Sequence, residues 1–359
     1  MRSERYDRVM RAIRREVPDR VPWALWGHFP AAPFLRYYSW EKANRDGCEL
    51  ARSHVALLHA LEYKMDLLKV TPFYRFMAYH WGSRFRFTNN DEVVETLEVV
   101  VQATEDWGKL WVLDPRKELR EHLRAVAILH REIGRTLPFL YTVPSPLVQA
   151  LHGVSTPSRV YADMQAQPDA LKAGLETIAQ TCIEFGKACI AEGAAGIFFG
   201  IGGGGDLWSR LSRRQLDEYA LHYDRMVLQA LAHAPIKLLH ICSSDSEDPQ
   251  RNGGLMEAGW FKQYPVDAIN WRSASFTSPP TAKQIYGDRF CIVAGLDHKT
   301  VLRHGSPADV EAQVKAALAT TAAGGGFILA PSCTLYQDTP LANYNAVAKA
   351  VHQYGHYPS

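Results

Sequence analysis

The 359-residue sequence lacks several features that define whole classes of protein. Its six cysteines include no C-x-x-C pair and no regular framework, which argues against a disulfide scaffold and against a structural zinc site closed by four ligands. No apolar run approaches the roughly 20 residues of a membrane span, and residues 1–20 lack the apolar core of a signal peptide. A net charge of +2 gives no reason to expect nucleic acid or a membrane surface as partner. We therefore expect a cytoplasmic globular protein.

Hydrophobic residues make up 47% of the chain, enough for a large core. Short apolar runs, typical of parallel strands covered on both faces, alternate with helix-patterned segments. The predicted strands are residues 21–26, 66–70, 138–143, 195–200, 236–241, 267–271, 290–296 and 326–330. Eight strands alternating with helices predict an α/β fold, a (β/α)8 TIM barrel forming a single domain over residues 1–359. A doubly wound sheet is the alternative, but its glycine fingerprint after the first strand is missing.

Two further patterns bear on the architecture. Residues 92–104 alternate between apolar and polar side chains, which predicts a β-hairpin inserted after the second strand. The glycine run Gly202–Gly205 follows the fourth predicted strand without the Gly-Lys-Ser/Thr sequence of a phosphate loop. We interpret it as a rim loop that lets a bulky partner approach.

His240 and Cys242 lie at the end of the fifth predicted strand, and Cys333 follows the eighth. Alternate residues of a strand point to the same side, and the carboxyl ends of barrel strands form one rim. An imidazole and two thiolates suit zinc, and three protein ligands leave a fourth position open for chemistry. We therefore predict a catalytic metal site formed by His240, Cys242 and Cys333. The alternative is that the buried cysteines are ordinary core residues. Because strands five and eight are not neighbours, Cys333 has to reach across the mouth of the barrel.

Other predicted strand ends carry candidate substrate-binding residues. They are Trp26, His28, Phe73, Tyr74, Asn270, Trp271 and Asp297. The aromatic rings would provide a dry pocket, and core packing is the alternative for them. His28 would orient substrate or transfer a proton, unless it is a satisfied loop histidine. Asp297 would orient His240 or contact substrate, and a helix cap is its alternative role.

Several segments, in their order along the chain, resemble the uroporphyrinogen decarboxylase superfamily. They are residues 4–9, 18–22, 240–242, 264–271, 295–297, 327–333 and 338–343. The resemblance implies a (β/α)8 barrel. Decarboxylases of the superfamily carry Arg-Gln-Ala-Gly-Arg after the first strand and Gly-His-Gly after the last. Here the corresponding residues are 26–32, which contain no arginine, and Ser332-Cys333-Thr334.

The pattern His240-x-Cys242 followed by the distant Cys333 is similar to the other branch, the zinc-dependent methyltransferases. This resemblance implies zinc as cofactor, a small-molecule methyl donor or acceptor, a corrinoid carried by a partner protein, and a homodimer. The chain lacks the Asp-x-His-x-x-Gly pattern of corrinoid domains, so a corrinoid would come from another protein. Two alternatives remain: a divergent decarboxylase or other lyase without zinc, and a non-catalytic tetrapyrrole- or corrinoid-binding protein.

Overall fold

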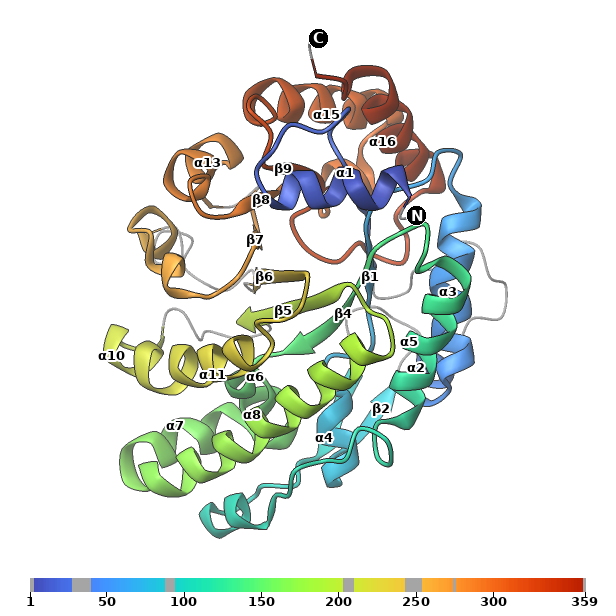
Figure 1. Ribbon diagram of the computed structural model, residues 1–359. Coiled ribbons are helices and arrows are strands. Elements are labelled where there is room, and N and C mark those ends of the chain that lie inside the picture. The colour runs from blue at the N-terminus through green and yellow to red at the C-terminus, as the bar shows by residue number, and fades with distance from the viewer. Residues whose placement is uncertain are drawn as a thin grey trace.

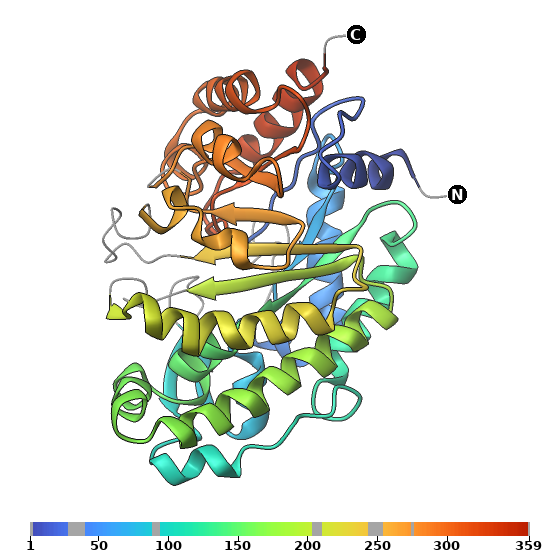
Figure 2. The same cartoon turned by 60° about the vertical axis from the view of Figure 1, so that its left-hand side comes forward.

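A curled parallel sheet forms the centre of the molecule (Figure 1). The computed structural model describes residues 3–27, 40–87, 94–202, 210–242, 254–273 and 276–357. Seven strands follow the order β1-β4-β5-β6-β7-β8-β9 and all pair in parallel. Their bounds are β1 (Leu68–Val70), β4 (Phe139–Pro144), β5 (Gly196–Gly202), β6 (Ile236–Cys242), β7 (Ala268–Trp271), β8 (Cys291–Leu296) and β9 (Phe327–Pro331). Each end lies within two residues of the prediction, and Figure 2 shows the strand arrows running the same way.

The first predicted strand, residues 21–26, is not a regular strand, so the prediction of eight strands is wrong at this point. Ala24 donates its N–H to the carbonyl of Leu329 on β9, and Asp66 donates its N–H to the carbonyl of Trp23. The N–H of Trp23 goes to the carboxylate of Asp66 rather than to a backbone carbonyl, and Pro22 has no N–H to offer. The segment therefore bridges β9 and the residues before β1 without a continuous ladder, and the fold is TIM-barrel-like.

Helices surround the sheet on its outer side (Figure 1). The described helices are α1 (Glu4–Ile13), α2 (Trp40–Arg45), α3 (Gly47–Ala60), α4 (Phe76–Trp81), α5 (Arg120–Ile133), α6 (Pro146–Gln149), α7 (Pro157–Ala166), α8 (Pro168–Ala191), α10 (Arg213–Gln215), α11 (His222–Ala230), α13 (Pro279–Tyr286), α14 (Val301–His304), α15 (Pro307–Thr321) and α16 (Leu341–Tyr354), with short 3-10 or π turns η1 (Thr104–Lys109), η2 (Ala150–Val154), η3 (Leu216–Leu221) and η4 (Trp260–Gln263). Capping explains where α15 begins. The Ser306 side chain accepts a hydrogen bond from the N–H of Asp309, and Pro307 occupies the first turn of the helix. None of the helices described is long and apolar enough to cross a membrane.

Alternation along the strands separates two cores. One cluster fills the inside of the curled sheet, with Leu67, Leu140, Phe198, Leu238 and Ala268 among its members. The other lies between the sheet and the helices. Two residues further along each strand, on the same inner side, the residues are Lys69, Thr142, Gly200, His240 and Asn270. The interior thus changes from apolar to polar toward the carboxyl ends of the strands, which is where sites form in barrels of this kind.

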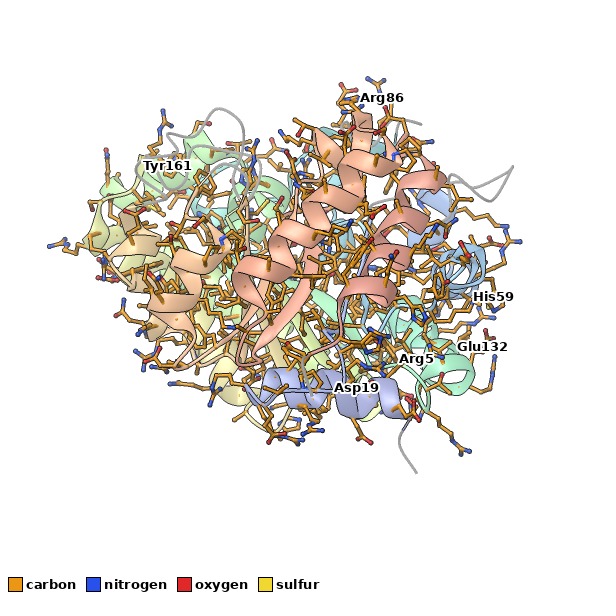
Figure 3. The ribbon with its side chains drawn as sticks, turned by 90° about the horizontal axis from the view of Figure 1, so that it is seen from above. Arg5, Asp19, His59, Arg86, Glu132 and Tyr161 are labelled. Atoms are coloured by element: carbon orange, nitrogen blue, oxygen red, sulfur yellow. The ribbon has the colours of Figure 1, made fainter. Side chains whose placement is uncertain are left out.

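An antiparallel pair stands apart from the main sheet, between β1 and β4 in the chain. It consists of β2 (Arg84–Phe87) and β3 (Val94–Glu98). Most of its side chains are exposed, and Arg86 points outward at the edge of the molecule in Figure 3. The predicted hairpin at residues 92–104 therefore supplies only β3, whose partner strand precedes it. The alternation does not mark a buried face, because only Val94 of this strand is half-buried and Leu97 is 52% exposed.

At the opposite end of the barrel interior, a buried carboxylate joins three segments. Asp66 is fully buried and accepts hydrogen bonds from Arg8 of α1 and from Arg20, each at 2.7 Å. Arg8 also contacts Asp19, an exposed residue that lies beside α1 in Figure 3. These charge-assisted bonds hold α1 and the extended segment against the start of β1.

Candidate metal centre

Strands β6 and β9 bring the three predicted ligands together at the carboxyl end of the sheet. His240 and Cys242 are the third-last and last residues of β6, and Cys333 follows the end of β9 by two residues. The Sγ of Cys333 lies 3.6 Å from the Nε2 of His240. The ligand atoms of all three residues lie within 4.8 Å of one another. Cys333 thus reaches across the mouth of the barrel.

These distances fit a single zinc ion. Zn–S and Zn–N bonds of about 2.3 and 2.0–2.1 Å place the ligand atoms of a tetrahedral site roughly 3.3–3.8 Å apart. The His240–Cys333 separation already falls in this range, and small side-chain rotations would bring Cys242 into it. One imidazole and two thiolates are also the donors that zinc prefers.

Asn270 on β7 orients the imidazole. Its Nδ2 donates to the carbonyls of Val293 and Pro331, at 2.6 and 3.1 Å, so its Oδ1 is the acceptor facing His240. The Oδ1 lies 2.6 Å from the Nδ1 of His240, which therefore carries the proton. The lone pair of Nε2 is left to face the two cysteines. Metal-binding histidines are typically oriented in this way.

Cys333 is prepared to act as a thiolate. A hydrogen bond with Cys242 lowers the pKa of the Cys333 thiol well below its ordinary value, whereas burial opposes it; the positive charge of His240 or His298 would lower the pKa further whenever these imidazoles are protonated. His298 follows β8, and its Nδ1 donates to the Oγ of Ser332, because that hydroxyl donates its own proton to the carbonyl of Leu296.

Two residues that sequence reasoning missed lie beside the three ligands. Lys69, on β1, is only 6% exposed, and burial lowers its pKa to about 8, against the opposing influence of the Cys333 and Cys242 sulfurs. Its Nζ lies 4.4 Å from the ring centre of Phe198, and the same ring lies 5.1 Å from that of His240. A lysine inside the apolar run of a buried strand was the available signal. Phe198 gave none, because aromatic residues in strands usually serve the core.

Among the aromatic candidates, Trp26 belongs to the interior of the sheet. Its ring meets that of Phe198 edge-on at 5.5 Å, and its buried Nε1 has no hydrogen-bond partner in the described part of the chain. His28, the neighbouring candidate, lies outside the described residues, as do Gly203–Gly205 of the glycine run.

The remaining candidates take other roles. Trp271 points to the helix side of the sheet and donates from Nε1 to the carbonyl of Thr277, so it is a core residue. Phe73 packs among Phe85, Phe87 and Tyr74 on the same outer side and lines a cavity of about 590 Å³ there. The hydroxyl of Tyr74 contacts the guanidinium of Arg75.

Asp297 and Asn270 both make hydrogen bonds within the protein, and for Asp297 these are the helix cap considered as its alternative role. The carboxylate of Asp297 accepts from the N–H groups of Lys299 and Thr300, so it caps the turn before α14. Asn270, rather than Asp297, orients His240. The amide group of Asn270 is fully buried, and its hydrogen bonds go to other groups of the protein.

We expect Asn270→Ala to weaken zinc binding about 10- to 100-fold, because the Nδ1–H of His240 loses its acceptor and the ring loses its orientation. Competition with a chelator measures the change. Thr142→Val is the matched control, since Thr142 belongs to the same inner layer and loses a buried hydrogen bond to the Val70 carbonyl. Equal zinc affinity in Asn270→Ala and the parent would contradict this role.

Metal-free protein should be alkylated by iodoacetamide at Cys333 near pH 6.5, because a lowered pKa keeps the reactive thiolate populated below the ordinary range. Burial raises the pKa values of Cys182, Cys189 and Cys291, which should stay unmodified. Peptide mass spectrometry across a pH series gives the rate at each cysteine, with exposed Cys48 as internal comparison. The expectation fails if Cys333 gains reactivity only in the alkaline range.

The fold and the site together define a class: a TIM-barrel-like α/β protein with a His-Cys-Cys cluster at the carboxyl end of its sheet. The family model of uroporphyrinogen decarboxylase (URO-D) matches residues 4–354 of the chain. The chain belongs to this family. It is 24% identical over 259 residues to the uroporphyrinogen decarboxylases of Yersinia pestis (strain Pestoides F) and Yersinia pseudotuberculosis serotype O:1b (strain IP 31758), covering 69% of this chain and 67% of each relative.

Two solved structures share the fold. A methyltransferase from Methanosarcina mazei superposes with a TM-score of 0.77 at 17% identity, covering 99% of both chains. A B12-independent methionine synthase from Shewanella sp. W3-18-1, in complex with selenomethionine, gives a TM-score of 0.55 at 11% identity over 94% of this chain and 97% of that one.

Proposed function

We propose that the protein is a zinc-dependent methyltransferase that moves a methyl group to or from a thiolate, with a corrinoid carried by a partner protein as the other methyl carrier. The convergence of His240, Cys242 and Cys333 carries this proposal. A zinc ion there would stabilise a bound substrate sulfur as thiolate near neutral pH. The full-length likeness to a methyltransferase agrees with this choice within the family.

The protein's own residues would prepare the reaction. Asn270 holds His240 with its Nε2 lone pair toward the two cysteines, which as thiolates would neutralise a divalent ion. A Cβ added at Gly200, opposite His240 on β5, would meet no atom of the described residues within 4 Å, so the described part of the chain leaves space beside the imidazole. Phe198 provides an apolar wall. In that space, the thiolate sulfur would form a bond to the methyl carbon while the carbon–donor bond breaks and the donor keeps the electron pair.

Methyl transfer from methylcobalamin to a small thiol tests the proposal, since loss of the cobalt–methyl bond changes the absorption spectrum. We expect zinc-loaded protein to accelerate transfer and metal-free protein to lose the acceleration, with recovery on adding zinc. Release of CO2 from a carboxylated tetrapyrrole by metal-free protein would favour the decarboxylase alternative. Stoichiometric corrinoid binding without turnover of any thiol would favour a non-catalytic binder.

A further inference from the structure

Lys69 is a buried cation without a conventional partner. It is the second residue of β1, and its side chain extends into the interior because its neighbours Leu68 and Val70 belong to the outer core. Within the described chain it makes no hydrogen bond and no ion pair, and its Nζ lies 4.4 Å from the ring centre of Phe198. Burying an ammonium group is unfavourable unless a negative charge compensates it or the lysine loses its proton. Burial lowers the pKa of Lys69 to about 8, so the charged form still predominates near neutral pH, and an anion nearby would stabilise it.

The two cysteine sulfurs can supply that anion only while no cation is bound. Both act electrostatically on Lys69. When Cys242 and Cys333 are thiolates around a divalent ion with neutral His240, their charges are cancelled by the ion. Among the described residues, no other negative charge then compensates Lys69, and a ligand at the open metal position could supply one.

We infer that Lys69 selects the charge of the ligand at the open metal position and favours an anionic sulfur, a thiolate, over a neutral thiol or thioether. The inference rests on the proposed function and adds the residue that determines which form of the substrate is held. The residues involved are neighbours in the structure. Phe198 contacts both Lys69 and His240, and the open space at Gly200 adjoins His240. Cys242 and Cys333 lie beside the imidazole and also act electrostatically on Lys69, so a sulfur bound together with them would be exposed to the charge of the ammonium group.

Charge selection would also affect the product. When the thiolate sulfur gains a methyl group and the donor departs with the bonding electrons, the sulfur becomes a neutral thioether. The attraction to Lys69 is then lost, so the product is bound more weakly than the substrate. In the reverse direction, the same residue would favour the demethylated thiolate as the bound species.

The groups that titrate near Lys69 are few in the described chain. Cys242, Cys333 and His240 face it across the interior. Behind β1, His54 donates from Nδ1 to the carbonyl of Leu50 and accepts at Nε2 from the N–H of Thr71, and burial lowers its pKa to about 4. His54 therefore stays neutral over the range in which thiols are titrated.

The test compares Lys69→Met, which removes the charge but keeps an apolar stem, with Lys69→Arg, which keeps a permanent charge. Cobalt(II)-loaded proteins are titrated with 2-mercaptoethanol between about pH 6 and 9, and the sulfur-to-cobalt absorption band reports thiolate binding. Dimethyl sulfide, a neutral thioether, is the ligand control. Removing an opposite charge within about 4–6 Å shifts a pKa by roughly 1–3 units. Thiol affinity near neutral pH should thus fall about 10- to 1000-fold in Lys69→Met.

In the expected result, Lys69→Met keeps its metal and its weak binding of dimethyl sulfide, and thiol binding moves to higher pH. Lys69→Arg resembles the parent below about pH 8, the pKa to which burial lowers Lys69. An unchanged thiol pH profile in metal-loaded Lys69→Met would overturn the inference while leaving the proposed function standing. Loss of the metal from Lys69→Met would also overturn it, since Lys69 would then be needed to assemble the site. A parent protein that binds no metal would overturn the proposed function itself.

Discussion

Cys333→Ser is expected to release the metal and abolish methyl transfer. A serine hydroxyl stays protonated near neutral pH and is a poor zinc ligand, so His240 and Cys242 would be left as a two-ligand site. Zinc affinity should fall by at least about 1000-fold, because metal affinity depends on the number of deprotonated ligands. Metal analysis after dialysis against a chelator measures the loss.

Cys291→Ser is the matched control, because Cys291 is buried in the interior of the same sheet but belongs to no ligand cluster in the described chain. It should keep its zinc. Circular dichroism should show both variants folded, since Cys333 lies after the last strand and is partly exposed. Zinc retained in Cys333→Ser, or lost equally in Cys291→Ser, would exclude the three-ligand site.

Asp66→Asn is expected to lower the free energy of unfolding by about 3–5 kcal/mol, because it removes the buried carboxylate that Arg8 and Arg20 share and leaves Arg8 only its surface partner Asp19. Arg8 is 7% exposed and the Arg20 side chain 13%, whereas Asp66 is fully buried. The same substitution also weakens the acceptor for the N–H of Trp23, which joins the extended segment to β1. Denaturant unfolding gives the value.

Asp19→Asn is the comparison, since Asp19 pairs with Arg8 from the surface with 60% of its side chain exposed. An exposed pair contributes about 0–1 kcal/mol. Similar losses in the two variants would show that the Asp66 network does not anchor the N-terminal segment.

The sequence predicts the ligand cluster because two simple rules apply to it. Residues two apart on a strand point the same way, which places His240 with Cys242, and strand ends in a parallel barrel meet at one rim, which places Cys333 near them. The alternation rule also separates Asn270 from Trp271: if one faces the interior, the other faces the helices. Asn270 and Trp271 therefore cannot both face the interior of the sheet.

Other features depend on contacts between distant segments and leave little trace in the sequence. Asn270 orients His240 through an amide whose other hydrogen bonds go to β8 and the end of β9. The extended segment at residues 21–26 has the composition of a strand, but the Asp66 carboxylate takes the place of a backbone acceptor. Asp297 follows a strand, as catalytic residues do, but caps the next turn. In each case, the role of the residue depends on a side-chain hydrogen bond that secondary-structure propensity alone does not predict.

X-ray absorption at the zinc edge of the purified protein tests the central claim most directly. We predict about one zinc per chain, with two sulfur ligands near 2.3 Å and one imidazole nitrogen near 2.0–2.1 Å, and a third sulfur when a thiol is added. A protein without zinc, or a zinc ion surrounded only by nitrogen and oxygen, would contradict the account.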